Sequence, residues 1–322
     1  MPQSCWIATD GAAGNEKQCL ALAHYLGVEA EVFRLSLRSP WEQFAPGFRW
    51  MARLGFRGEF ARRLGEPGPD LFIGCGRRAA LAALALRRQG SIRTIQILNP
   101  RVDSRLFDWV VCPRHDGLQG PNVIQTTGAL HRVDDDWLEA ARQQWKHLAE
   151  LPSPRIGVLV GGPGKHIAMD RDSLERLLSA ARSLACPGGE GDGTQGSVLV
   201  TASGRTPGYL LPVIKQFLAN TPGLAWTGPE DGENPYAGLM AWADRLVVSA
   251  DSVNMISEAL GTGRPVHCEA PAGVAGRLAA FHQQLNDRGL VRKLDDPSEY
   301  SYPPLREAPR VAAQLRQQLA AA

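Results

Sequence analysis

The sequence predicts an α/β protein of two domains, each built around a doubly wound parallel sheet. Its 322 residues exceed the size of one typical domain, which is about 100–150 residues. In both halves, short apolar or β-branched runs alternate with amphipathic stretches, which is the pattern of βαβ units. The Pro-Ser-Pro segment at 152–154 then supplies a stiff connector near the middle of the chain.

The first domain is expected to span residues 1–150. Its strands are expected at 5–9, 30–34, 71–74, 94–98, 109–112 and 122–126, and its helices at 15–26, 77–88 and 134–149. The helix at 134–149 begins with three carboxylates, which suit the positive end of a helix dipole.

The second domain is expected to span residues 151–305, followed by an amphipathic C-terminal helix at 306–322. Its strands are expected at 155–160, 197–202, 224–227, 245–249 and 265–268. Segment 186–196 is rich in glycine and is predicted to be a surface loop. Ligands of such sheets bind at the carboxyl ends of the strands, so the loops that follow these strands are the candidate sites.

The bulk composition narrows the class of protein. Hydrophobic residues make up 44% and charged residues 21%, and the net charge of +2 gives no reason to expect a nucleic-acid partner. No apolar run approaches the roughly 20 residues of a membrane span. The first residues lack the pattern of a secretion signal, so we expect the chain in the cytoplasm. The six scattered cysteines are expected to be buried apolar residues.

The first candidate loop follows the strand at 155–160 and contains Gly162, Gly164 and Lys165. Glycines let backbone N–H groups approach phosphate oxygens, and a lysine adds a mobile positive charge. The spacing is not that of a P-loop, and a structural turn explains the glycines equally well. The interpretation therefore depends on the neighbouring loops.

The second candidate loop follows the strand at 197–202 and contains Ser203, Gly204 and Arg205. A guanidinium group suits bidentate contact with phosphate. Alternatively, Thr206 before Pro207 is typical of a helix N-cap with proline at the first helical position.

The third candidate loop follows the strand at 245–249 and leads into a helix. If Ser252 caps that helix, the 3.6-residue period places Asp251, Asn254, Met255 and Glu258 on one side, with Ser257 beside them. The two oxygens of Glu258 match the vicinal hydroxyls of a ribose, and a helix N-terminus favours a diphosphate. An amphipathic helix with solvated acids is the alternative.

Two resemblances rest on these residues. Glu258-Ala259 followed by Gly263-Arg264-Pro265 resembles the E-A-x-x-x-G-x-P signature of GT-B nucleotide-sugar glycosyltransferases. The chain also resembles the mitochondrial-fission Elm family over most of its length. The segments that carry this resemblance are Thr9-Asp10-Gly11, Asn99-Pro100-Arg101, Gly162-Pro163-Gly164, Asn234-Pro235-Tyr236, Ala243-Asp244, Asp251-Ser252 and Ser257-Glu258-Ala259. Bacterial members of that family are regarded as candidate glycosyltransferases, whereas plant members are linked to recruiting a dynamin-like protein to mitochondria.

The resemblance implies a GT-B-like fold of two Rossmann-type domains that face each other across a cleft. It also implies that the final helix packs back on the first domain. The implied donor site consists of Gly164, Lys165, Ser203, Arg205, Asn234, Tyr236, Asp251, Ser252 and Glu258. Its ligand would be a nucleotide-diphosphate sugar, bound as a substrate with no separate cofactor.

A general base is needed on the acceptor side, because the attacking hydroxyl must lose a proton. Asp10 is the first candidate for this base, in a loop that also contains Gly11, Gly14 and Asn15. The resemblance places this loop on the acceptor side, together with Asn99 and Arg101. An Asx turn is the structural alternative for Asp10. His115 is the second candidate, with a surface histidine as its alternative.

No metal is expected. Asp170-Arg171-Asp172 and Asp134-Asp135-Asp136 resemble metal-binding D-x-D motifs, but both lie at predicted helix starts. Carboxylates there interact favourably with the helix dipole without a metal ion.

The segment at 34–63 combines seven arginines, two glutamates and six aromatic residues. From Phe48 onward it could form an amphipathic helix on an anionic membrane, beside a lipid-linked acceptor at the inner face of the bacterial inner membrane. A buried helix with solvated arginines explains the same residues.

The leading hypothesis is a metal-independent glycosyltransferase that moves a sugar from a nucleotide-diphosphate donor to an envelope glycan or lipid-linked acceptor. A noncatalytic GT-B-shaped adaptor that recruits a protein partner is the first alternative. A nucleotide-sugar epimerase, which shares the donor loops but needs no acceptor, is the second.

Overall fold

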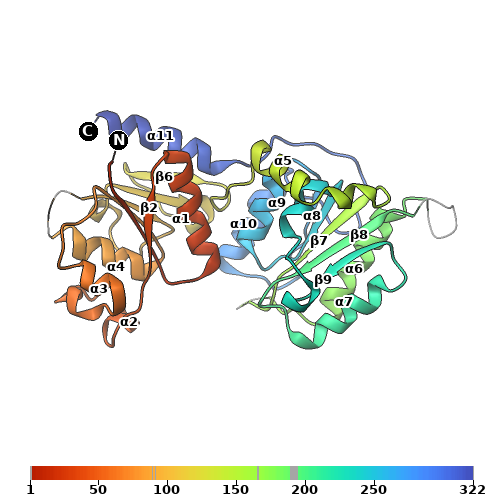
Figure 1. Ribbon diagram of the computed structural model, residues 1–322, viewed down its shortest axis with the longest axis horizontal. Coiled ribbons are helices and arrows are strands. Elements are labelled where there is room, and N and C mark those ends of the chain that lie inside the picture. The colour runs from red at the N-terminus through yellow and green to blue at the C-terminus, as the bar shows by residue number, and fades with distance from the viewer. Residues whose placement is uncertain (1, 89, 91, 165–166, 189–194, 322) are drawn as a thin grey trace. The chain divides into compact units, whose positions relative to one another are not determined.

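The structure is a computed structural model that describes residues 2–88, 90, 92–164, 167–188 and 195–321 (Figure 1). The chain forms two compact units. The first consists of residues 1–131 together with 306–322, and the second consists of residues 132–305. Each has its own parallel sheet with helices on both faces.

The first unit contains a six-stranded sheet in the order β2-β1-β3-β4-β5-β6, with all pairs parallel. Its strands are β1 (Cys5–Thr9), β2 (Ala30–Arg34), β3 (Leu71–Cys75), β4 (Arg93–Ile97), β5 (Trp109–Pro113) and β6 (Val123–Thr126). Its helices are α1 (Ala13–Leu26), α2 (Trp41–Phe44), α3 (Gly58–Arg63), α4 (Arg77–Leu86) and α11 (Glu307–Ala321), with 3-10 helices η1 (Ala52–Gly55), η2 (Ser104–Leu106) and η3 (Arg114–Asp116).

Helices cover both faces of this sheet, which is why β1 and β3 are buried along their whole length. Side chains alternate between the faces. Trp6 packs in one cluster with Leu81 of α4, whereas Ile7 packs in the opposite cluster with Leu22 of α1 and Val311 of α11.

Helix α11 packs against α1, as Figure 1 shows at the two ends of the chain. Val311 and Leu315 are fully buried there. The carboxylate of Glu307 accepts a hydrogen bond from the Thr127 backbone N–H at 2.6 Å. The C-terminal segment is therefore part of the first unit.

The segment at 34–63 is not a continuous amphipathic helix from Phe48, so that expectation is wrong. Gly58 has a φ of +67°, a conformation that interrupts a helix, and the chain forms the separate short helices η1 and α3 instead. Phe56 and Phe60 are buried in the core, whereas Phe44 and Trp50 are 64% and 69% exposed.

The second unit contains a five-stranded parallel sheet in the order β11-β10-β7-β8-β9. Its strands are β7 (Arg155–Val160), β8 (Ser197–Ala202), β9 (Gly223–Trp226), β10 (Arg245–Val248) and β11 (Val266–His267). Its helices are α5 (Asp135–Gln144), α6 (Arg171–Ala185), α7 (Leu211–Leu218), α8 (Tyr236–Trp242), α9 (Val253–Gly261) and α10 (Gly276–Asp287), with 3-10 helices η4 (Lys146–Glu150), η5 (Gly208–Leu210) and η6 (Pro229–Asp231).

The boundary between the units lies between residues 131 and 132, rather than at the expected position between 150 and 151. Helix α5 buries Leu138 and Ala141 in the same cluster as Leu239 of α8. Trp145 packs so closely on Gly238 that a Cβ there would lie 2.3 Å from its ring. The sequence predicted that α5 is amphipathic. It did not predict which of the two sheets the apolar face of α5 would pack against.

Within the described residues, no helix combines the length and apolarity needed to span a bilayer. All six cysteines are free, and five are buried.

Candidate functional site

The candidate site of the second unit lies where its strand order reverses. Strand β7 is flanked by β8 on one side and β10 on the other, so successive crossovers run in opposite directions from it. In open α/β sheets, ligands bind at the carboxyl ends of the strands at such a point. The loops that follow β7, β8 and β10 are the three that the sequence indicated.

Asp251 joins these three loops. Its side chain is fully buried, and its carboxylate accepts hydrogen bonds from the Gly162 N–H at 3.1 Å and the Ser249 hydroxyl at 2.7 Å. It also pairs with the Arg205 guanidinium at 2.7 Å. Because 55% of the Arg205 side chain stays exposed, Asp251 holds a cation at the surface of the site.

Close packing explains two glycines of the first loop, Gly161 and Gly162. A Cβ at Gly161 would lie 2.1 Å from the Asp251 carboxylate, and one at Gly162 would lie 2.3 Å from the Arg205 carbonyl oxygen. A Cβ at Gly164, by contrast, would meet nothing within 4 Å. Lys165 lies outside the described residues.

Thr206 ties the β7 loop to the β8 loop and does not cap a helix. Its hydroxyl donates to the Gly161 carbonyl at 2.6 Å and accepts from the Ser203 N–H at 3.0 Å. The following 3-10 helix η5 has Pro207 at its N-cap and no side-chain cap. The capping alternative for Thr206 is therefore wrong, because its oxygen is occupied within the loop. Gly204, beside Arg205, has open space where a Cβ would be.

Ser252 caps α9, accepting a hydrogen bond from the Met255 N–H at 3.3 Å. Asn254 and Met255 lie half-buried in the first turn. Ser257 is fully buried, and its hydroxyl donates to the Val253 carbonyl at 2.7 Å within the helix.

Glu258 is 7% exposed, and its carboxylate accepts a short hydrogen bond from the Tyr236 hydroxyl. Burial, followed by the charge of Glu258, raises the pKa of Tyr236, so the phenol keeps its proton and remains a donor. The Tyr236 N–H in turn donates to the Asn234 side-chain oxygen at 3.0 Å. The structure thus links the start of α8 to α9 through residues 22 positions apart.

His282 was not found from the sequence. On α10, its Nε2 lies 2.8 Å from the Ala250 carbonyl oxygen, beneath the loop that carries Asp251. Burial lowers the pKa of His282, so its imidazole is neutral at pH 7 and its Nε2–H donates to that oxygen. No local motif marks this contact, because the partners are 32 residues apart.

A pocket of about 360 Å³ adjoins the site, lined in part by Ser249, Ala250 and Met169. Its lining comes from the end of β10, from residues 167–169 after β7 and from residues 269–272 after β11, which makes room for part of a ligand beside the β10 loop.

In the first unit, Asp10 follows β1, and β1 lies at the reversal point of that sheet, between β2 and β3. The Asp10 Oδ1 accepts from the Ala12 N–H at 3.1 Å and the Asn15 amide at 2.9 Å. This is an Asx turn extended by Asn15. Gly11 has a φ of +86°, which suits the turn, and Gly14 lies within the first turn of α1.

Asn99, Arg101 and His115 follow β4 and β5 at the same edge of the sheet. The Asn99 oxygen accepts from the Arg101 N–H at 2.8 Å, and Arg101 adopts a φ of +60°. His115 lies in η3 after β5. Since β5 is three strands from β1, the spacing of roughly 4.8 Å per strand separates their ends by about 14 Å. Asp10 and His115 are therefore not a contacting pair.

The two D-x-D segments serve as helix caps. Asp170 accepts from the Ser173 N–H at 2.9 Å at the start of α6, and Asp134 accepts from the Trp137 N–H at 2.8 Å at the start of α5. In the described part of the chain, no group of three His, Cys, Asp or Glu side chains is placed to hold a metal ion.

Solved structures of two proteins share this fold over nearly the whole chain. UDP-GlcNAc 2-epimerase from Methanocaldococcus jannaschii has a TM-score of 0.51 at 11% identity, with 98% of this chain and 99% of that chain covered. A glycosyltransferase from Rickettsia africae has a TM-score of 0.50 at 10% identity, with 99% and 97% covered. At such identities the likeness concerns the fold alone, which is the two-domain GT-B-like α/β fold expected from the sequence.

Sequence comparison gives a nearer relative. Mitochondrial fission protein ELM1 of Arabidopsis thaliana is 35% identical over 287 residues, which cover 80% of this chain. The match spans 65% of the length of the plant protein. Residues 13–319 match the family model described as Mitochondrial fission ELM1, and the chain therefore belongs to that family.

Proposed function

We propose that the second unit binds a nucleotide-diphosphate sugar and that the protein transfers the sugar to an acceptor hydroxyl. The observation that carries the proposal is the assembly around Asp251. It fixes the glycine-rich turn after β7, the exposed Arg205 after β8 and the N-terminus of α9 at the carboxyl ends of three adjacent strands. Backbone N–H groups, a guanidinium group and a helix N-terminus are the groups that stabilise a diphosphate.

Each predicted donor residue then has a proposed role. Arg205, Lys165 and the backbone N–H of Gly204 hold the diphosphate, together with the α9 terminus at Ser252. Gly162, Gly164 and Ser203 shape the two turns around it, because their N–H groups donate to Asp251, Ile167 and Thr206 within the protein. Glu258 accepts hydrogen bonds from the ribose hydroxyls, with Tyr236 fixing the orientation of its carboxylate. Asn234, Asn254 and Met255 contact the nucleoside. Asp251 and Ser257 act by positioning rather than by contact, because both side chains are buried.

Asp10 is the proposed general base. Both of its hydrogen bonds within the described structure use Oδ1, which leaves Oδ2 to accept the proton of the attacking hydroxyl. The Asx turn then orients the carboxylate, so the structural and catalytic interpretations are compatible. We propose a single displacement in which the acceptor oxygen bonds to the sugar carbon as the nucleoside diphosphate leaves.

The proposed acceptor is an envelope glycan or a lipid-linked glycan at the inner face of the bacterial inner membrane. The proposed reaction needs no metal, because the groups around Asp251 and the α9 terminus stabilise the leaving diphosphate. Similarity of fold to an epimerase keeps nucleotide-sugar epimerisation as the second candidate. The family description names mitochondrial fission and no enzymatic activity, so the adaptor, in which the same surface recruits a protein partner, stays as the noncatalytic alternative.

Binding is tested first, by the thermal stability of the purified protein with a panel of nucleoside diphosphates and their sugars. A ligand at 100 times its dissociation constant adds about 2.7 kcal/mol to the free energy of unfolding. We expect stabilisation by one nucleotide series, lost in Glu258→Gln and Arg205→Ala. Glu230→Gln, an exposed acid in the same unit, is the control and keeps the response.

Turnover is tested next with the nucleotide sugar that binds. Asp10→Asn should keep the thermal shift and lose sugar transfer, because it retains the turn but removes the base. A new nucleotide sugar formed without acceptor would identify an epimerase. Absence of stabilisation by every nucleotide would refute the donor site and favour the adaptor.

A further inference from the structure

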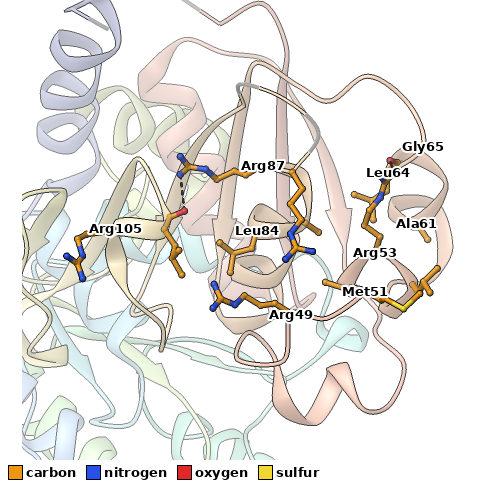
Figure 2. Close-up of a pocket in the computed structure, with 14 residues that line it drawn as sticks. Arg49, Met51, Arg53, Ala61, Leu64, Gly65, Leu84, Arg87 and Arg105 are labelled. Carbon is orange, nitrogen blue, oxygen red and sulfur yellow. Dashed lines mark hydrogen bonds between the residues drawn. The ribbon is translucent and has the colours of Figure 1, made fainter.

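The first unit contains a second concave site, far from the candidate nucleotide site in sequence. Its pocket has a volume of about 770 Å³ and is shown in Figure 2. Four separate segments line it: residues 49–54, the end of α3, the end of α4 and η2. We call it the arginine-rimmed pocket.

Its floor is aliphatic. Ala52, Leu64 and Ala85 are buried there, and Leu84 and Leu106 also line the pocket. None of the lining residues is aromatic. Such a surface suits a hydrocarbon chain and offers no aromatic side chain on which a nucleobase could stack.

Its rim is cationic. Arg49, Arg53, Arg87, Arg88 and Arg105 line the pocket, and no acidic residue does. In the view of Figure 2, Leu84 lies between the guanidinium groups of Arg49 and Arg87.

Some of these arginines already have protein partners. Arg87 pairs with Asp108 at 3.3 Å and Arg105 with Asp103 at 2.8 Å, while Arg53 donates to the Leu64 carbonyl. The side chains of Arg49 and Arg88 are exposed. Neither forms an ion pair or a hydrogen bond with any residue that the structure describes. These two cations are therefore the ones placed to bind an external anion.

The surface beside the pocket is unusually apolar. Six large hydrophobic side chains are exposed in the described structure, and four of them, Phe44, Trp50, Met51 and Leu54, belong to one stretch. Met51 and Leu54 also line the pocket. Met51 adopts a φ of +46°, a conformation that costs a non-glycine residue free energy. No acid occurs between residues 44 and 58.

We propose that the arginine-rimmed pocket binds a phospholipid at the surface of an anionic membrane. One hydrocarbon chain occupies the aliphatic floor, and the phosphate pairs with Arg49 and Arg88. Phe44, Trp50 and Leu54 enter the interface around the bound lipid, where apolar side chains beside cations are stabilised. The charge complementarity and the aliphatic floor together favour a phospholipid over a nucleic acid.

This inference does not depend on sugar transfer. All of its residues belong to the first unit and can be assayed without a nucleotide. Failure of lipid binding would thus leave the donor-site experiment unaffected, and the reverse also holds.

The test measures partition of the full chain onto vesicles of phosphatidylcholine, with or without phosphatidylglycerol. We expect binding that requires the anionic lipid and that falls at high salt, because the Debye length shortens to about 3 Å at 1 M. Arg49→Ala and Arg88→Ala should each weaken the partition constant about five-fold, since a cation near an anionic surface contributes that much.

Matched controls lie on the opposite face of the same sheet. Arg316→Ala on α11 removes the same charge, and Leu20→Ala on α1 matches Leu54→Ala, because both leucines are exposed. The controls should bind as the parent does, whereas Leu54→Ala should bind more weakly. Circular dichroism melting establishes that each variant is folded.

Dodecyl phosphate, which joins one hydrocarbon chain to one phosphate, tests binding of a single lipid without a membrane. Calorimetry below its micelle concentration should detect binding to the parent, weakened in Arg49→Ala, with inorganic phosphate bound far more weakly. Equal binding to neutral and anionic vesicles, or equal losses in Arg49→Ala and Arg316→Ala, would overturn the proposal. So would a folded protein that stays off both kinds of vesicle, and the apolar surface would then be a protein-docking face.

Discussion

Asp251 carries a charge in a fully buried side chain, and each of its neighbours compensates for that burial. The Gly162 N–H, the Ser249 hydroxyl and the Arg205 guanidinium all point at its carboxylate. Buried charges with such partners stabilise one geometry strongly, because losing any partner leaves a desolvated group. The donor-site loops are thus preorganised by a residue that need not touch the donor.

The glycines of the first loop allow a matched substitution test. Gly161→Ala places a Cβ 2.1 Å from the Asp251 carboxylate, which must then move. Gly164→Ala adds its Cβ in open space. We expect Gly161→Ala to lose about 2 kcal/mol or more of the free energy of unfolding, together with the nucleotide response. Gly164→Ala should change stability by less than about 0.5 kcal/mol, as measured by urea unfolding.

Two buried histidines give the second unit a pH dependence. Burial lowers the pKa of both His282 and His267 below the ordinary imidazole value of 6.5. The unfolded chain therefore binds more protons than the folded one as the pH falls below 6.5, and the free energy of unfolding falls with it. The loss continues until the folded-state pKa values are passed.

Urea unfolding between pH 7 and pH 5 measures this effect. In His282→Gln the decline should be shallower than in the parent, because one of the two depressed groups is gone. His24→Gln, at an exposed position on α1, should decline as the parent does. An unchanged slope in His282→Gln would contradict the assignment.

At the scale of elements, α11 supplies part of one hydrophobic core of the first unit. Leu315 is fully buried in the cluster that also holds Leu22 of α1 and Ile95 of β4. Arg316 and Arg93 add hydrogen bonds between α11 and the rest of the unit.

Leu315→Ala should destabilise the first unit by about 2–5 kcal/mol, because it leaves a cavity in a closely packed core. Gln317→Ala, exposed on the same helix, is the control and should change stability by less than about 0.5 kcal/mol. Amide hydrogen exchange shows which unit is destabilised. Amides of α1 and β1 should exchange faster in Leu315→Ala, whereas protection in β7 and β8 should not change.

At the scale of the whole molecule, the sequence predicted the two parallel sheets and the loops of the candidate site because those features depend on local patterns. Apolar runs marked the strands, and Ser252 before an amphipathic stretch predicted the cap that α9 has. The unit boundary was misplaced because α5 packs on α8, which lies about a hundred residues later. The His282 contact and the arginine-rimmed pocket escaped prediction for the same reason, since both join distant segments.

The division of the chain also bears on how it is made. Residues 132–305 form a unit that interrupts the first one, whose last helix is α11. During synthesis, the second unit can therefore complete its core while the first still lacks a helix. Until α11 emerges from the ribosome, the side of α1 that it covers stays open to solvent and to chaperones. The first unit, whose synthesis starts before that of the second, therefore completes its core after the second unit.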